Sequence, residues 1–199
     1  MKTLVIVDVQ NDFMPGGALA VPDGDAIVPV INRLMGDYDL VVASQDWHPK
    51  GHGSFASSHE GRAQFEEIML HGEPQTLWPD HCVQGSEGAR LHKDLDARPI
   101  EAIFRKGLDP EVDSYSAFFD NNHARATGLS GYLREKGAMC LDLVGLAGDV
   151  CVGFTALDGL REGFDVRLVE PGIRALDDEA YGAMKRRIAD KGGKMIELL

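Results

Sequence analysis

Short runs of consecutive apolar residues alternate along the chain with segments in which apolar residues recur every three or four positions. Continuous apolar runs are typical of strands covered on both faces, and the wider spacing is typical of helices. The predicted strands are residues 3–9, 39–46, 101–107, 140–147, 165–172 and 194–199. The predicted helices are residues 25–36, 127–136, 150–162 and 177–191.

This order of elements predicts an α/β protein with three layers, in which helices cover both faces of a six-stranded, mainly parallel sheet. One interval breaks the alternation, because the long segment between Asp46 and Ile100 is rich in Gly, Pro, Ser and His. A structureless loop of this length is unusual in a compact domain. We therefore expect a single domain over residues 1–199, with a small inserted subdomain at about residues 47–99.

The composition is that of a globular protein with an acidic surface. The 199 residues are 44% hydrophobic, which allows a sizeable core, and the net charge is −12. Such a charge repels phosphate groups, so nucleic acid and anionic membranes are poor partners; solubility is the simplest reason for it. No apolar stretch approaches the roughly 20 residues that span a membrane.

The cysteines and the first residues indicate the compartment. The chain has three cysteines, Cys82, Cys140 and Cys151. A set that is this small and odd in number does not indicate a disulfide framework. The opening segment MKTLVIVDVQNDF becomes polar too early for a secretory signal. We therefore expect a cytoplasmic protein, and the sequence leaves monomer and homodimer open.

Reactive side chains follow several of the predicted strands. The first strand ends in Asp8, the second in Asp46, the third in Lys106, and Cys151 lies just after the fourth. In parallel sheets, functional groups gather at the carboxyl ends of the strands. An acid, a lysine and a thiol that meet at one edge are typical of nucleophilic catalysis. Asp142 lies well inside the fourth strand, and we expect it to be structurally paired.

The stretch GLAGDVCVGFTAL places Cys151 where a strand passes into a helix. The helix dipole and a nearby Lys106 would both favour the thiolate. The alternative is that Cys151 is simply a small buried apolar residue. The catalytic interpretation requires Lys106 to lie within about 10 Å of the Cys151 sulfur.

A second candidate group consists of metal ligands. Asp46 and His48 are two residues apart in an extended segment, so their side chains point the same way. His81 follows in the motif WPDHC, and the motif GHGSF adds His52 and Ser54. One carboxylate and two imidazoles suit zinc, iron or manganese and leave coordination positions open.

Three aromatic residues lie in polar segments near these candidates: Phe13, Trp78 and Tyr115. Ordinary core packing would explain each of them. Together they could line an apolar slot that suits a flat aromatic ligand.

Seven segments, in order, resemble the successive blocks of the nicotinamidases, which are isochorismatase-like cysteine hydrolases. These segments are VDVQNDF, GGALAVP, SQDWHP, WPDHCVQ, FRKG, VDSYSAF and GLAGDVCV. The resemblance extends over nearly the whole chain. It implies hydrolysis of nicotinamide to nicotinate and ammonia through a cysteine thioester, in NAD salvage, with pyrazinamide as a further substrate.

The resemblance also implies roles for individual residues around the thiol. Asp8, Lys106 and Cys151 match the catalytic triad of the nicotinamidases. The backbone N–H groups of Ala147 and Cys151 match the oxyanion hole. Related proteins have a cis peptide at the position of Leu146 and Ala147.

By the same resemblance, Asp46, His48 and His81 match the ligands of one divalent metal ion, with zinc expected first and iron or manganese as alternatives. Some members supply a further ligand at the position of Ser54, for which His52 is the neighbouring alternative.

Phe13, Leu19, Trp78 and Tyr115 match the substrate pocket. The chain departs from many members at Gly148, where they have threonine. We expect the turn around Gly148 to keep its geometry with a looser loop.

Two other functions remain open at the level of the sequence. One is a different isochorismatase-like amidohydrolase, although those relatives usually lack the metal block. The other is a non-catalytic α/β protein that binds a small ligand. No G-x-G-x-x-G or Walker motif is present, which argues against a nucleotide-binding role.

Overall fold

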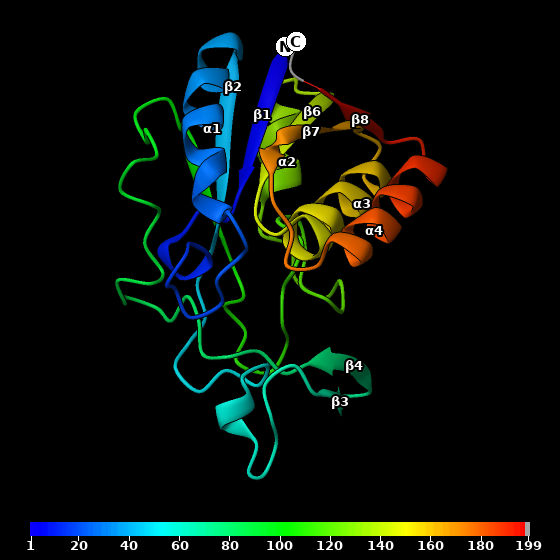
Figure 1. The fold of residues 1–199 in the computed structure, drawn as a ribbon. Helices are drawn as coiled ribbons and strands as arrows, with labels where there is room; N and C mark the ends of the chain where they lie inside the picture. Colours follow the sequence, from blue (N-terminus) through cyan, green and yellow to red (C-terminus); the bar gives the residue numbers. More distant parts are fainter. Residues whose placement is uncertain (198–199) are drawn as a thin grey trace.

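The computed structural model describes residues 1–197, and within them six strands form one sheet in the order β5-β2-β1-β6-β7-β8 (Figure 1). The strands are β1 (Lys2–Val7), β2 (Leu40–Asp46), β5 (Ala102–Lys106), β6 (Cys140–Gly145), β7 (Asp165–Ile173) and β8 (Lys194–Ile196). Every neighbouring pair is parallel, which confirms the predicted sheet. The last predicted strand was too long at its end, where residues 198–199 lie outside the described residues.

The helices lie close to their predicted positions. They are α1 (Val28–Leu34), α2 (Leu129–Glu135), α3 (Gly153–Arg161) and α4 (Asp178–Asp190). The predicted helix 25–36 is α-helical only in its middle, with 3₁₀ turns on both sides. Pro29 has no N–H to bond the Asp25 carbonyl, which accepts from Val28 instead and tightens the first turn.

The sheet is covered on both faces, as a three-layer fold requires. Leu4 and Ile6 of β1 pack with the residues of α1, whereas Val5 and Val7 pack with the buried faces of α2, α3 and α4. Figure 1 shows α3 and α4 side by side and α1 apart from them. Among residues 1–197, no helix is both long and apolar enough to cross a membrane.

The segment between β2 and β5 contains a small antiparallel sheet, made of β3 (Glu67–Leu70) and β4 (Glu73–Thr76). In Figure 1 this sheet lies beyond the carboxyl ends of the main strands. The segment is tied to that edge by backbone bonds such as His92 N–H to the Val9 carbonyl, at 2.9 Å, just after β1. It therefore brings its own side chains to the ends of β1, β2 and β5.

Asp142, the acid inside β6, is structurally paired as expected. Its carboxylate accepts two hydrogen bonds from the Arg167 guanidinium, at 2.5 and 2.6 Å, and one from the Tyr38 hydroxyl, at 2.6 Å. These partners compensate a charge that is only 2% exposed. Asp142 therefore belongs to the framework rather than to the reactive edge.

Candidate active site

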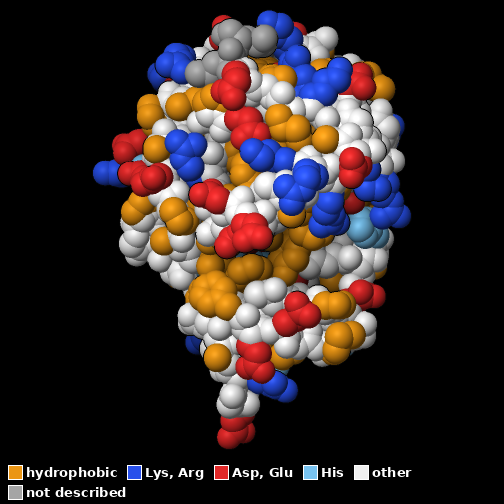
Figure 2. Space-filling view, turned by 45° about the vertical axis from the view of Figure 1, so that its right-hand side comes forward, with side chains coloured by type: hydrophobic (Ala, Val, Ile, Leu, Met, Phe, Trp, Pro, Cys, Tyr) orange, Lys and Arg blue, Asp and Glu red, His pale blue; other side chains and the backbone are white. Residues whose placement is uncertain are grey.

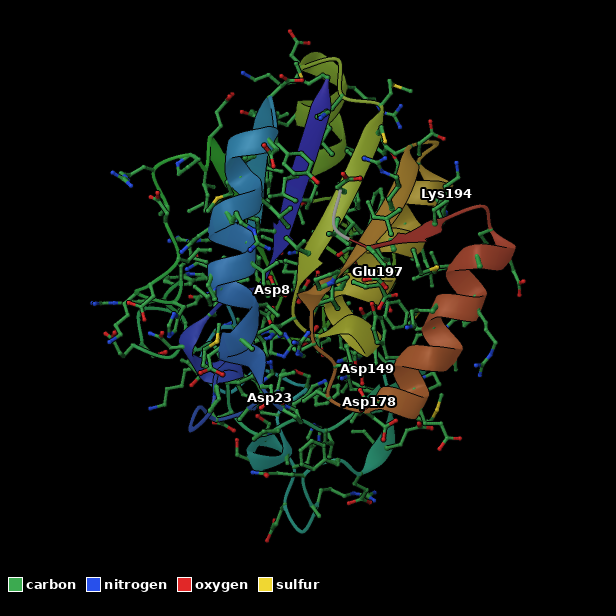
Figure 3. All side chains as sticks on the ribbon, turned by 45° about the horizontal axis from the view of Figure 1, so that its top comes forward. Asp8, Asp23, Asp149, Asp178, Lys194 and Glu197 are labelled. Carbon is green, nitrogen blue, oxygen red and sulfur yellow. The ribbon has the colours of Figure 1, made fainter. Side chains whose placement is uncertain are left out.

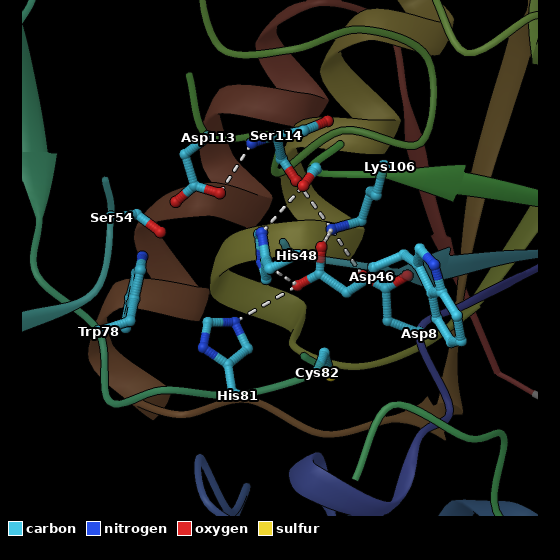
Figure 4. A network of polar contacts seen from close by, with 12 residues as sticks. Asp8, Asp46, His48, Ser54, Trp78, His81, Cys82, Lys106, Asp113 and Ser114 are labelled. Atoms are coloured by element: carbon cyan, nitrogen blue, oxygen red, sulfur yellow. Dashed lines mark hydrogen bonds and ion pairs between the residues drawn. The ribbon is translucent and has the colours of Figure 1, made fainter. Parts of the chain in front are cut away.

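Four adjacent parallel strands, β5, β2, β1 and β6, end at one edge of the sheet, and their terminal side chains meet there. The Lys106 ammonium lies 2.9 Å from Asp8 Oδ2, 3.0 Å from Asp46 Oδ1 and 3.4 Å from the Cys151 sulfur. It also donates to the Ser114 carbonyl, at 2.8 Å. The distance condition for thiol activation is therefore met with a wide margin, and Figure 4 shows Lys106 between the two carboxylates.

Asp8 directly follows β1, near whose end Figure 3 labels it, and its side chain is fully buried. Ser44 of β2 donates a hydrogen bond to Asp8 Oδ1, at 2.7 Å. Burial raises the pKa of the Asp8 carboxyl above its usual value, against the lowering effects of the Lys106 ammonium and the Ser44 hydrogen bond. A carboxyl whose pKa is raised in this way is suited to taking up and returning a proton.

The Cys151 thiol differs from the sequence-based expectation in its protonation. Burial raises the pKa of this thiol well above its usual value, and the Lys106 ammonium lowers it only in part. Cys151 also lies inside a π-helical turn, Gly148–Val152, rather than in the first turn of an α-helix. A raised pKa favours the thiol form, so attack by this sulfur needs a base, and Asp8 is the carboxylate available beside it.

The turn that carries Cys151 begins where β6 meets β1. Gly145 has φ +122°, and a Cβ there would lie 2.0 Å from the Val7 carbonyl oxygen, so only glycine fits. The Leu146–Ala147 peptide that follows is cis, as the resemblance implied. The Ala147 carbonyl then accepts from the N–H groups of Val150 and Val152, at 3.1 and 3.0 Å.

The same turn is anchored to the segment before α4. Gly148 N–H donates to the Arg174 carbonyl, at 2.8 Å. The Asp149 carboxylate accepts from the N–H groups of Leu176 and Asp177, at 2.9 and 3.1 Å. Figure 3 shows Asp149 near Asp178, the first residue of α4. This anchoring fixes the backbone that carries the proposed oxyanion hole.

Gly148 has a structural reason to lack a side chain. A Cβ built there would lie 2.8 Å from Tyr181 Cε2 and 2.9 Å from Ile173 Cγ2. The ring of Tyr181, from α4, fills the space that the family's threonine side chain would need. The turn is therefore packed against α4, so the expected looser loop is not supported.

Asp46, His48 and His81 form a buried group whose ligand atoms all lie within 4.8 Å of one another. Nδ1 of His48 faces the Gly107 carbonyl at 3.2 Å, and Nδ1 of His81 faces the Pro79 carbonyl at 2.8 Å. A carbonyl only accepts, so both Nδ1 atoms carry the proton and both Nε2 atoms present lone pairs.

These two Nε2 atoms lie 3.1 and 3.4 Å from Asp46 Oδ2, as the dashed lines in Figure 4 indicate. Lone pairs this close to a carboxylate oxygen in a buried site repel it, and a positive charge between them would remove this repulsion. The donor set therefore fits a divalent metal ion, with the backbone carbonyls that orient both imidazoles already in place.

The two remaining candidates for a metal ligand lie beside this group. Ser54 is buried, and its hydroxyl and His52 Nδ1 are 2.8 Å apart. Figure 4 shows the Ser54 hydroxyl on the side of Trp78 that faces His48. Ser54 as a ligand stays a prediction.

One pocket contains the predicted substrate-binding residues together with the reactive groups. Its lining residues are Phe13, Leu19, Asp46, Trp78, His81, Asp113, Tyr115, Ala147, Val150, Cys151 and Leu176. Trp78 Nε1 donates to the Tyr115 hydroxyl at 3.3 Å, which holds two of the rings in a fixed relation. Figure 2 shows apolar side chains in a hollow of the surface, with acidic groups at its border.

Three polar residues of the site were not singled out from the sequence. Gln10 clamps the backbone of Asp46, with hydrogen bonds of 2.7 Å from its N–H and 2.8 Å to its carbonyl. Ser44 bonds Asp8, and Asp113 lines the pocket. All three lie within the quoted motifs, and Ser44 is two residues before Asp46, a spacing that places both on one face of β2.

The fold is a three-layer α/β fold, in which helices cover both faces of a six-stranded parallel sheet. The isochorismatase domain family matches residues 2–198, and the chain belongs to this family. The nicotinamidase of Escherichia coli (strain K12) is 49% identical over 197 residues, which covers 94% of this chain and 92% of that protein.

Solved structures agree with this assignment. An Acinetobacter baumanii nicotinamidase/pyrazinamidase superposes with a TM-score of 0.96 at 44% identity, over 98% of this chain and 95% of the other. The pyrazinamidase of Pyrococcus horikoshii in complex with zinc superposes with a TM-score of 0.82 at 33% identity, over 99% of both chains.

The packing of Gly148 predicts a cost for any side chain there. Gly148→Ala should lower the free energy of unfolding by about 1–3 kcal/mol, because the added methyl group overlaps Tyr181 and Ile173. Urea unfolding of the purified variant measures this change.

Gly131→Ala is the matched control, because nothing lies within 4 Å of a Cβ there and the residue is inside α2. This control should gain stability. An unchanged or increased stability of Gly148→Ala would contradict the packing argument.

Proposed function

We propose that this protein is a nicotinamidase, which hydrolyses nicotinamide to nicotinate and ammonia through a thioester on Cys151. The observation that carries the proposal is the contact of one buried ammonium, Lys106, with Asp8, Asp46 and the Cys151 sulfur, directly beside a metal-ligand set. The similarity to nicotinamidases over most of the chain supports the same reaction.

The pocket suits a flat ring that carries an amide. Phe13 and Trp78 would hold the faces of the pyridine ring, with Leu19 and Tyr115 completing the apolar wall. Asp46, His48 and His81 would hold a divalent cation, whose chemistry when bound is to receive the ring nitrogen. Cys151 lines the same pocket, so the carboxamide of a bound ring would meet its sulfur there.

The first half of the reaction transfers the acyl group to sulfur. Asp8 takes the proton of the Cys151 thiol, and Lys106 stabilises the thiolate. The sulfur attacks the carboxamide carbon, and the N–H groups of Ala147 and Cys151 hold the resulting oxyanion. Asp8 returns the proton to the amide nitrogen, the C–N bond breaks, and ammonia leaves.

The second half regenerates the thiol. Asp8, again a carboxylate, accepts a proton from a water molecule whose oxygen attacks the thioester carbon. The C–S bond breaks and the Cys151 sulfur recovers the proton from Asp8. The nicotinic acid formed in this way loses its own proton to bulk water and leaves as nicotinate. Pyrazinamide has a similar ring amide, so we propose it as a second substrate.

Two further attributes belong to the proposal. Zinc is the proposed metal, supported by the zinc in the Pyrococcus horikoshii structure, with iron or manganese as alternatives. A cytoplasmic location is supported by the three cysteines, all free in the structure.

Ammonia release from nicotinamide tests the function directly. The wild-type protein should release ammonia, Cys151→Ala should fall to the background rate, and Asp46→Ala or a chelator should remove both the bound cation and the activity. A different amide as the preferred substrate, or full activity in Cys151→Ala, would overturn the proposal.

The hydrogen bond from Ser44 predicts a pH effect. This bond lowers the pKa of Asp8, and Asp8 acts as a base only when ionised. Ser44→Ala should therefore raise that pKa and move the acid limb of the kcat/KM profile to higher pH, with activity recovered above it. Ser130→Ala is the control, since its hydroxyl, in α2, donates to Glu162 rather than to a residue of the site. An acid limb that stays in place or moves to lower pH would exclude Ser44 from this role.

A further inference from the structure

A second group of buried side chains, His48, His52 and Asp113, lies beside the metal-ligand set. One ligand atom of each lies within 4.8 Å of those of the other two. The three residues are 0%, 0% and 4% exposed. Asp113 also lines the pocket that contains Cys151, so the group joins the pocket wall to the ligand His48. Figure 4 shows the Asp113 carboxylate on the side of His48 where Ser54 lies.

The hydrogen bonds of His52 identify its tautomer. The backbone N–H of Ser54 donates to His52 Nδ1 at 3.1 Å, so this nitrogen carries no proton. In a neutral ring the proton is then on Nε2. That atom is buried and makes no hydrogen bond within residues 1–197, although the Asp109 carbonyl faces the ring. In the neutral ring Nε2 is therefore a donor whose hydrogen bond is not made within the described residues, and it offers no lone pair to a metal ion.

The Asp113 carboxylate can accept more hydrogen bonds than it does. Its Oδ1 accepts from Ser114 N–H at 2.8 Å, and its Oδ2 accepts from Gln75 Nε2 at 3.0 Å. A carboxylate can accept about four hydrogen bonds, so half of its capacity is unused. One ring nitrogen of His52 and one carboxylate oxygen of Asp113 lie within 4.8 Å of each other with no direct hydrogen bond between the two residues, a separation that one water molecule can bridge.

This second group is not suited to a metal ion of its own. His48 directs Nε2 toward Asp46 and donates from Nδ1 to the Gly107 carbonyl, so it has no lone pair left for a second cation. His52 offers a protonated nitrogen. The charge of Asp113 can instead balance the charges around it. Asp8 and Asp46 are negative, and Lys106 and a bound dication are positive. Together they leave one net positive charge in a buried site. Asp113 is the buried carboxylate that balances it.

We propose that Asp113 and His52 are positioning residues of the metal centre. The Asp113 carboxylate raises the affinity of Asp46, His48 and His81 for a divalent cation, and His52 donates to it through one bridging water molecule. This inference rests on the proposed metal site. It concerns cation binding, which is measured without any turnover of substrate.

The test is the dissociation constant for Zn²⁺, and for Co²⁺ with its absorption spectrum, measured by competition with a chelator on the full chain. Asp113→Asn and His52→Gln should each weaken binding by about 10-fold or more, as loss of outer partners of metal ligands does. The double variant should lose less than the product of the two single effects, because both act on one shared water. Urea unfolding of the metal-free variants shows whether each remains folded.

Glu111→Gln is the matched control, since it removes one acidic charge from an exposed position of the same loop. Its cation affinity should equal that of the wild type. If Asp113→Asn and His52→Gln both bind within about twofold of the wild type, the inference is wrong while the metal site stands. Two cations per wild-type chain would also overturn it. A wild-type chain that binds no cation would overturn the metal site together with this inference.

Discussion

A buried ammonium is the constraint on which this site depends. Lys106 is 2% exposed, and removing its charge from water is costly unless anions surround it. Asp8 and Asp46, from the two neighbouring strands, supply those anions at 2.9 and 3.0 Å and raise the pKa of Lys106 well above its usual value despite burial. The parallel register of β5, β2 and β1 is what brings the three groups together.

Asp46 links the two parts of the site through its two oxygens. Oδ1 pairs with Lys106 on the side of the thiol, while Oδ2 faces the imidazoles of His48 and His81. Gln10 holds the Asp46 backbone on both sides, so the carboxylate has little freedom to move. The proposed metal-ligand set and the proposed nucleophile therefore share one rigid anion.

Much of this arrangement could be predicted from the sequence, because parallel strands of known direction place their final residues at one edge. Asp8, Lys106 and Cys151 were found in this way, and so were Asp46 and His48. The pairing of Gly148 with Tyr181 could not be predicted, since α4 lies far along the chain and its docking depends on tertiary packing. The effect of burial on the pKa of the Cys151 thiol could not be predicted either, because it depends on how fully the folded chain covers the sulfur.

The central claim is that Cys151 carries the acyl group during the reaction. Rapid acid quenching of the protein with nicotinamide, followed by mass spectrometry, tests it most directly. The account predicts that the peptide containing Cys151 gains the mass of a nicotinoyl group, and that Cys82 and Cys140 do not. Two results together would contradict it: ammonia is released while Cys151 stays unacylated, and added hydroxylamine yields no hydroxamate above the background rate.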